Sequence, residues 1–173
     1  MAKHAVIRKD RLYGTDVAPA LVSLRFVDGN GKGADIDNGN VVRLDGLMTY
    51  TDGTIERELY KAVAPAANTP LADIAIVGTN EVMYDERKKN LDEFYNEAGR
   101  NSLGYRPHAG DMFGVTAEGL DAAAAIAKGD IVELQASTKL KVVKSATAGS
   151  TKLGVIADIN KVGRYTYYVV EVK

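Results

Sequence analysis

The sequence Lys128-Gly129-Asp130-Ile131-Val132-Glu133-Leu134 contains the pattern that best indicates the fold class, and the chain uses this pattern three times. A second copy is Asn38-Gly39-Asn40-Val41-Val42-Arg43-Leu44, and a looser third copy is Ala109-Gly110-Asp111-Met112-Phe113. Glycine tolerates a positive φ angle, and Asn or Asp can bond its own local backbone, so each copy predicts a turn followed by a strand. We therefore expect a mainly β protein with short-stranded barrel or sandwich units.

The composition is that of an ordered globular protein. The chain has 173 residues, of which 46% are hydrophobic and 26% charged, a length that allows one domain or two small ones. Its 22 Lys and Arg residues balance 23 Asp and Glu residues. The net charge of -1 provides no basic field that would attract nucleic acid or an anionic membrane. We expect neither as a direct partner.

Cysteine is absent from the sequence. This excludes a disulfide framework, a thiolate zinc site and a cysteine nucleophile. No apolar run approaches the roughly 18 residues that span a membrane. The first residues lack the apolar core of a cleaved signal peptide, so secretion by that route is not expected.

Three regions differ in their sequence texture. Residues 1–20 mix charges with glycine and proline, which predicts an N-terminal arm. We expect a β-rich domain over residues 21–106 and a compact β domain over residues 107–173, where four strand signals follow at roughly 10-residue spacing. The boundary is placed near residues 100–108.

Two segments of the 21–106 region need separate interpretation. Residues 55–63 fit either a helical stripe or one face of a strand, and a strand is favoured because a turn precedes them and Ala64-Pro65 ends them. Leu91, Phe94, Tyr95 and Ala98 recur at helical spacing before Gly99, so one short helix is expected near residues 86–98.

Candidates for chemistry are few. His4 and His108 are the only histidines, and an enzyme using Asp111 or His108 is the weakest hypothesis because no nucleophile, base and orienting group can be assembled. Acidic side chains crowd the loop after Asp28, but Gly39 occupies the position where a calcium loop needs its final Glu. We expect no catalytic, metal-binding or cofactor-binding residue.

Carboxylates and tyrosines gather around residues 81–105. The carboxylates of residues 81–97 alternate with Arg and Lys, which is typical of a solvated face with paired charges. The chain has nine Tyr against three Phe and no Trp. Tyrosine packs its ring while keeping its hydroxyl bonded, which suits contact surfaces, although half-buried strand tyrosines would explain the same composition.

Several stretches after residue 65 share a sequence texture, namely residues 66–71, Glu81–Arg87, Asn96–Gly99, Gly110–Thr116, Lys128–Leu134, Gly154–Ile156 and Tyr168–Val172. With these stretches the chain resembles structural proteins of tailed-phage heads, and its last part is similar to small β-rich capsid decoration (cement) proteins. The resemblance covers residues 66–173 best.

This resemblance implies a virion protein that sits on the outer capsid surface, bridges subunits of the major capsid protein and uses no catalysis or cofactor. It also implies synthesis in the bacterial host cytoplasm and self-association as a trimer or as a cluster at a symmetry axis, while monomers in solution that assemble only on the capsid lattice fit equally well. We expect deletion of residues 1–14 to weaken attachment and to leave the fold intact. The expected partner-binding residues are Arg8, Lys9, Arg11, Tyr13, Tyr84, Arg87, Tyr95, Tyr105 and Arg106.

A second hypothesis is another virion component, such as a head-fibre base or a module that binds host-surface glycans. Exposed tyrosines could stack on sugar rings in such a module. The sequence leaves both hypotheses open.

Overall fold

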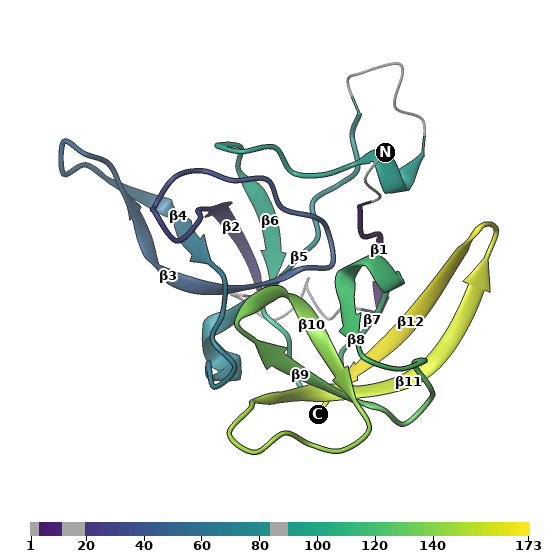
Figure 1. Ribbon diagram of the computed structural model, residues 1–173. Helices are drawn as coiled ribbons and strands as arrows, with labels where there is room; N and C mark the ends of the chain where they lie inside the picture. Colours follow the sequence, from purple (N-terminus) through teal and green to yellow (C-terminus); the bar gives the residue numbers. More distant parts are fainter. Residues whose placement is uncertain (1–3, 12–19, 84–89) are drawn as a thin grey trace.

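The computed structural model describes residues 4–11, 20–83 and 90–173, and its regular secondary structure is almost entirely β-strand (Figure 1). Strands and three single 3-10 turns (η) follow one another in the order β1 (Ile7–Arg11), β2 (Leu21–Phe26), β3 (Val41–Thr49), β4 (Ile55–Val63), η1 (Leu71–Asp73), β5 (Ile74–Val77), η2 (Leu91–Glu93), β6 (Ser102–Tyr105), β7 (Met112–Val115), η3 (Ala117–Gly119), β8 (Leu120–Ala122), β9 (Ile131–Gln135), β10 (Ser137–Val143), β11 (Lys152–Val162) and β12 (Tyr165–Val172). The expected mainly β fold is confirmed, and residues 55–63 form the expected strand.

The strands form a closed barrel and a curled sheet. The barrel has the order β2-β4-β3-β5-β6, and the sheet has the order β1-β7-β12-β11-β9-β10-β8. Most neighbours are antiparallel, but β2 pairs with β4 and β10 pairs with β8 in parallel. The division expected at residue 106 falls between the barrel strands and β7. Independent folding of the two parts stays a prediction.

The three copies of the glycine pattern fold into the same turn. Gly39, Gly110 and Gly129 have φ angles of 86°, 94° and 91°, and β3, β7 and β9 begin two residues after them. In each copy the glycine N–H donates to a carbonyl on another part of the chain, and the N–H of that same residue donates back to the carbonyl of the following Asn or Asp. The residue that exchanges these two hydrogen bonds is Val77 for Gly39-Asn40, Val172 for Gly110-Asp111 and Ile156 for Gly129-Asp130, with N···O distances of 2.7 to 3.0 Å.

Two hydrophobic clusters hold the molecule together, and β3 and β5 contribute to both. Val42, Ala75 and Val77 lie in the cluster inside the barrel. Their neighbours Val41, Ile74 and Ile76 lie in the larger cluster, which also includes Phe113, Leu140 and Ile156 of the curled sheet. Because alternate side chains of a strand point to opposite faces, the continuous apolar run of β5 is buried on both sides.

The N-terminal region differs from the expected arm. Ala5, Val6 and Ile7 are buried, and β1 pairs with β7 through Ile7 opposite Val115. Residues 7–11 are therefore part of the curled sheet, and Ala5 and Ile7 help to cover its core. Residues 1–3 and 12–19 lie outside the described part of the chain.

The helix expected near residues 86–98 is not found in the portion that the structure describes, residues 90–98. That portion contains only η2, which Asn90 and Glu93 close with a capping box. The Asn96 side chain donates to the Ile36 carbonyl and to Asn38 Oδ1 at 3.1 Å each, and its backbone pairs with Ile36. These bonds to the barrel hold residues 94–96 in an extended conformation, so tertiary contacts override the helical spacing. Residues 86–89 lie outside the described residues.

Candidate partner-binding surfaces

The basic residues of β1 that were predicted to bind a partner lie against the chain itself. The Arg8 guanidinium lies 5.7 Å from the centre of the Tyr167 ring, and Lys9 Nζ lies 5.4 Å from the centre of the Tyr105 ring. Lys9 also donates to the Gly78 carbonyl. These contacts join β1 to β12 and to the end of the barrel, so a structural role accounts for both cations. Among the predicted partner-binding residues that the structure describes, Lys9 and Tyr105 come from distant parts of the chain and contact each other.

The remaining predicted residues are dispersed. Arg106 lies over the Tyr60 ring at 5.4 Å, and its Nε is buried without a hydrogen-bond partner. Tyr95 stacks on His4, with ring centres 4.6 Å apart and an interplanar angle of 23°. The side chain of Arg11 and the residues Tyr13, Tyr84 and Arg87 lie outside what the structure describes.

His4 connects the N-terminal segment to the rest of the fold, a role that was not predicted from the sequence. His4 Nδ1 lies 2.6 Å from Asp37 Oδ1, and the Ala5 N–H donates to Asp37 Oδ2 at 3.3 Å. The His4 N–H donates to the Asp92 carbonyl at 3.1 Å. These bonds tie the segment before β1 to two barrel connections. His4 and Asp37 are 33 positions apart in the sequence, so no local pattern signals their pairing.

The acidic loop after Asp28 is explained by backbone bonds. Asp28 Oδ1 accepts the N–H groups of Asn30 and Lys32 at 2.9 Å each, which holds the pKa of Asp28 below its usual value. Asp35 Oδ1 accepts the Ala98 N–H at 2.7 Å. Among residues 4–11, 20–83 and 90–173, no group of three or more His, Asp or Glu side chains is placed to hold a metal ion.

Asp111 stabilises the turn that contains residues 108–111. Its carboxylate is buried, and Oδ2 accepts the His108 N–H at 2.8 Å, while His108 Nδ1 lies 3.8 Å away. Asp130 repeats this bond with the Ala127 N–H at 2.7 Å. Since the same contact recurs in two turns, it explains Asp111 without catalysis.

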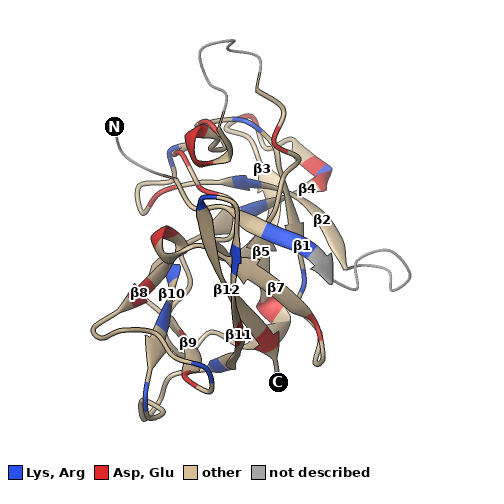
Figure 2. Ribbon diagram, turned by 90° about the vertical axis from the view of Figure 1, so that its right-hand side faces the viewer, with Lys and Arg blue, Asp and Glu red and all other residues tan. Residues whose placement is uncertain are grey.

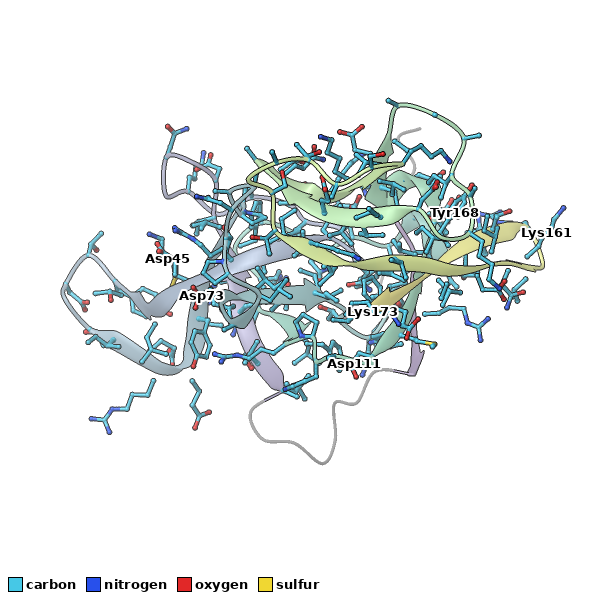
Figure 3. The ribbon with its side chains drawn as sticks, turned by 90° about the horizontal axis from the view of Figure 1, so that it is seen from below. Asp45, Asp73, Asp111, Lys161, Tyr168 and Lys173 are labelled. Carbon is cyan, nitrogen blue, oxygen red and sulfur yellow. The ribbon has the colours of Figure 1, made fainter. Side chains whose placement is uncertain are left out.

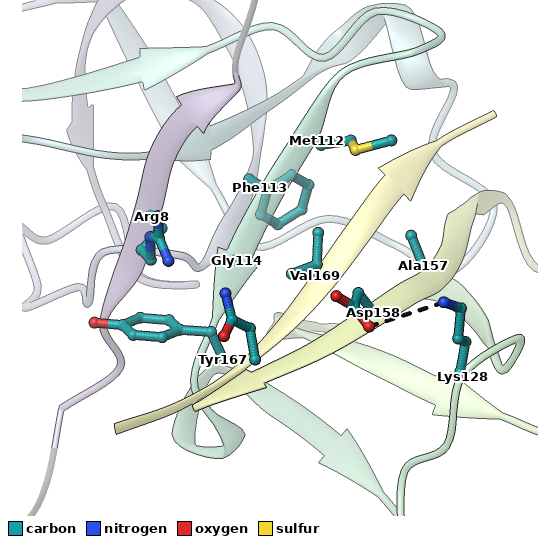
Figure 4. A pocket seen from close by; sticks show the side chains of 10 residues that line it. Arg8, Met112, Phe113, Gly114, Lys128, Ala157, Asp158, Tyr167 and Val169 are labelled. Carbon is teal, nitrogen blue, oxygen red and sulfur yellow. Dashed lines mark ion pairs between the residues drawn. The ribbon is translucent and has the colours of Figure 1, made fainter. Parts of the chain in front are cut away.

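A small hollow lies on one face of the curled sheet (Figure 4). It measures about 280 Å³, and Arg8 and Tyr167 lie at one side of it while Asp158 and Lys128 lie at the other. Lys128 Nζ and Asp158 Oδ1 are 3.8 Å apart. Burial raises the pKa of Tyr167, so its hydroxyl stays protonated at neutral pH. The hollow offers packing and hydrogen bonding but no activated group.

Two β-ribbons project from the body and carry most of its exposed apolar side chains. The first, here called the β3–β4 ribbon, comprises residues 45–58, and the second, the β11–β12 ribbon, comprises residues 158–168. They stand at opposite ends of the molecule (Figures 1 and 3). Of the large hydrophobic side chains that are exposed, the ribbons hold Leu47, Tyr50, Ile55, Ile159 and Val162.

Local bonds shape the β3–β4 ribbon. Gly46 has a φ angle of 76°, and at this point the register with β4 shifts, which marks a bulge. Asp45 pairs there with Arg43 and Lys61 at 3.0 and 3.2 Å. At the tip, the Tyr50 N–H donates to the Thr54 carbonyl and the Thr54 N–H donates to Asp52 Oδ1, both at 2.9 Å. The tip is therefore an ordered turn.

The β11–β12 ribbon turns tightly at Gly163-Arg164. Val162 pairs with Tyr165, and Gly163 has a φ angle of 58°, as a two-residue hairpin turn with glycine first requires. Arg164 pairs with Asp92, and the Tyr165 hydroxyl donates to Asp92 Oδ1 at 3.0 Å. These bonds fasten the base of the tip to η2, while residues 158–162 of β11 are exposed.

The charge distribution matches the neutral net charge. Figure 2 shows basic and acidic residues interspersed over both sheets, with a short basic stretch on β1. None of the described helices is long and apolar enough to cross a membrane. The described surface therefore combines many internal hydrogen bonds and ion pairs with two ribbons that carry exposed apolar side chains next to polar turns. Comparisons with protein-family models, with curated proteins and with solved structures found no match to this chain.

Proposed function

We propose that the chain is a structural virion protein that decorates and stabilises the outer surface of a tailed-phage capsid by bridging subunits of the major capsid protein. The proposed role is binding, without catalysis or a cofactor. It takes its family from the resemblance of residues 66–173 to capsid decoration proteins, and it takes its mode of action from the shape of the molecule.

The observation that carries the proposal is the pair of projecting ribbons. A bridging protein needs contact surfaces that face in different directions, and the ribbons lie at opposite ends of one body (Figure 3). Their exposed apolar side chains favour burial against a partner. Ile55 is 55% exposed and Val162 is 45% exposed. The short, closely bonded turns at both tips limit the entropy that binding would cost.

The capsid contacts predicted on Arg8, Lys9 and Tyr105 remain part of the proposal in a modified form. Their rings and cations already pack within the molecule, so they would present a preformed surface to a capsid subunit. The apolar ribbon side chains Leu47, Tyr50, Ile55, Ile159 and Val162 are added to this set because they are exposed.

Sedimentation with capsids that lack this protein tests the proposal. We expect the purified protein to pellet with the capsids and imaging to show density at fixed lattice positions. Replacing Ile55 by Asp should weaken pelleting, whereas Leu21→Asp on β2 serves as a control because Leu21 is 49% exposed but lies outside both ribbons. Folded protein that stays in the supernatant would contradict the proposal, and a glycan array would then test the head-fibre or host-binding alternative.

A further inference from the structure

Each ribbon has an outer edge that no described strand covers. β9 pairs with β11 only through Lys152, Gly154 and Val155, and the backbone bonds of the Gly129 turn reach no further than Ile156. Residues 158–162 therefore pair with β12 alone. In the barrel, β2 pairs with β4 from Leu59 onward, so residues 55–58 have an open edge as well. Open edges are templates for the addition of another strand.

Each edge carries side chains of both charges, Glu56, Arg57 and Glu58 on β4 and Asp158 and Lys161 on β11, and three of these are free, within the described structure, to pair with a second molecule. Glu56 and Glu58 are exposed on β4, and Lys161 is exposed on β11. Within the described residues, no ion pair is formed by any of the three. The opposite edges of the ribbons offer fewer charges. On β3 the one acidic residue is Asp45, which already pairs with Arg43 and Lys61, and residues 165–167 of β12, which lie beyond its pairing with β7, contain no charged side chain.

We propose that the β4 edge of one molecule adds antiparallel to the β11 edge of a second copy of this chain. The register that we infer places Ile55 opposite Val162 and Glu56 opposite Lys161. Directly opposed residues lie on the same face of a sheet, so the first pair buries two exposed apolar side chains and the second joins opposite charges. In this register Arg57 lies diagonal to Asp158, which also pairs with Lys128 of its own chain at 3.8 Å.

Other registers lose these pairings. A parallel arrangement that starts with Ile55 opposite Ile159 brings Arg57 opposite Lys161, and like charges in that position destabilise a sheet. An antiparallel shift by two residues places Ile55 opposite Asn160 and Glu56 opposite Ile159, and it keeps only the attraction between Arg57 and Asp158. Among these registers, the inferred one alone pairs Ile55 with Val162 and Glu56 with Lys161, and it also places Glu58 opposite Ile159.

The contact joins different surfaces of the two copies, because the ribbons lie at opposite ends of the molecule (Figures 1 and 3). Such head-to-tail contacts repeat from copy to copy and produce a ring or a chain. The proposal that this contact forms on a capsid rests on the proposed function, but the contact between two copies can be measured with the purified protein alone. Loss of capsid pelleting and loss of this contact are therefore measured separately.

Charge reversal provides the first test, with sedimentation velocity over a range of protein concentrations. We expect concentration-dependent association of the wild type, weakened about tenfold by Glu56→Lys or by Lys161→Glu alone. The double variant should recover much of the loss, because it restores the opposite charges in exchanged positions. A wild type that is monomeric at every concentration, or a double variant as weak as the sum of the singles, would overturn the proposal.

The absence of cysteine allows a second test that reads the direction of the contact. Ile55→Cys and Val162→Cys proteins are mixed and oxidised, and the disulfide-linked dimers are identified by mass spectrometry. We expect links between the two variants to exceed links within either one. Leu21→Cys mixed with Val162→Cys is the matched control for random collision. Equal amounts of all links, or an excess of links within one variant, would contradict a head-to-tail contact.

Discussion

The three glycine turns show how one residue type meets different demands at equivalent positions. All three have positive φ angles, but only Gly39 is packed. A Cβ atom at Gly39 would lie 2.7 Å from Val115 Cγ2, whereas nothing lies within 4 Å of a Cβ at Gly110 or Gly129. Backbone conformation therefore explains all three glycines, and packing between the barrel and β7 explains Gly39 in addition.

We predict that Gly39→Ala lowers the free energy of unfolding by about 2–4 kcal/mol, because it combines backbone strain with a steric clash. Gly129→Ala is the matched control and should cost about 1 kcal/mol from strain alone. Urea denaturation of the two variants measures the difference. Equal losses would show that the close contact with Val115 relaxes freely.

Asp92 should make stability depend on acid pH. Partial burial alone would raise its pKa, but the hydrogen bond from Tyr165 and the charge of Arg164 outweigh burial and hold the pKa below 3.8. A lowered pKa in the folded state stabilises the fold above the unfolded-state pKa, and this stabilisation is lost as the pH falls through the folded-state value. Asp92→Asn removes the titrating group.

We therefore expect the wild type to lose more free energy of unfolding than Asp92→Asn when the pH is lowered from about 5 to about 2. Urea denaturation at several pH values provides the two curves. Parallel curves for the two proteins would indicate that Asp92 has the same pKa in the folded and unfolded states.

Strands were predicted more successfully than the other elements, for a physical reason that particular residues show. Glycine turns and alternating side chains are local signals, so the strands after Gly39, Gly110 and Gly129 were located correctly. Leu91, Phe94, Tyr95 and Ala98 also give a local signal, but bonds from Asn96 to Ile36 and Asn38 hold part of this segment extended. A bond between residues 60 apart cannot be predicted from spacing within either segment.

β1 provides a prediction about an element. The expectation that residues 1–14 can be deleted without loss of the fold conflicts with the burial of Ala5, Val6 and Ile7. We expect Ile7→Ala to lower the free energy of unfolding by about 2–4 kcal/mol, because Ile7 is 5% exposed. Ile159→Ala is the control, since Ile159 is 41% exposed and should change stability by less than about 0.5 kcal/mol. If Ile7→Ala changed the free energy of unfolding as little as Ile159→Ala does, the N-terminal residues would be a free arm, as first expected.

The complete molecule has one large core that crosses from barrel to sheet. Val41, Ile74 and Ile76 of the barrel share this core with Phe113 and Ile156 of the sheet. Unfolding the sheet would expose the outer faces of β3 and β5, so neither part can lose its structure without a cost to the other. Cooperative unfolding is the expected consequence.

We predict a single calorimetric transition that Ile76→Ala shifts as a whole to lower temperature. Near-ultraviolet circular dichroism, which the tyrosines in both parts supply, should follow the same curve. Two separate transitions, with only one moved by Ile76→Ala, would instead support the division into two domains at residue 106.

The contact surfaces were only partly predictable from the sequence. Tyr95, Tyr105 and the cations of β1 were predicted to contact a partner. In the structure Tyr95, Tyr105, Arg8 and Lys9 instead make contacts within the molecule. The ribbons were missed because exposure depends on how far a hairpin extends beyond its neighbours. The sequences around Ile55 and Val162 are ordinary strand sequences. Their edges are open only because the neighbouring strands β2 and β9 end before they reach these residues.

The pairing of β1 with β7 also dictates the order of events during synthesis. The barrel strands can all associate once Tyr105 has left the ribosome, but Ile7 must wait for Val115 to emerge before its edge is matched. Contacts between residues so distant in the chain slow folding, and unmatched apolar segments invite aggregation in the meantime. The nascent protein therefore passes through an interval in which all barrel strands have been made, while Ile7 and the apolar outer faces of β3 and β5 still have no partner.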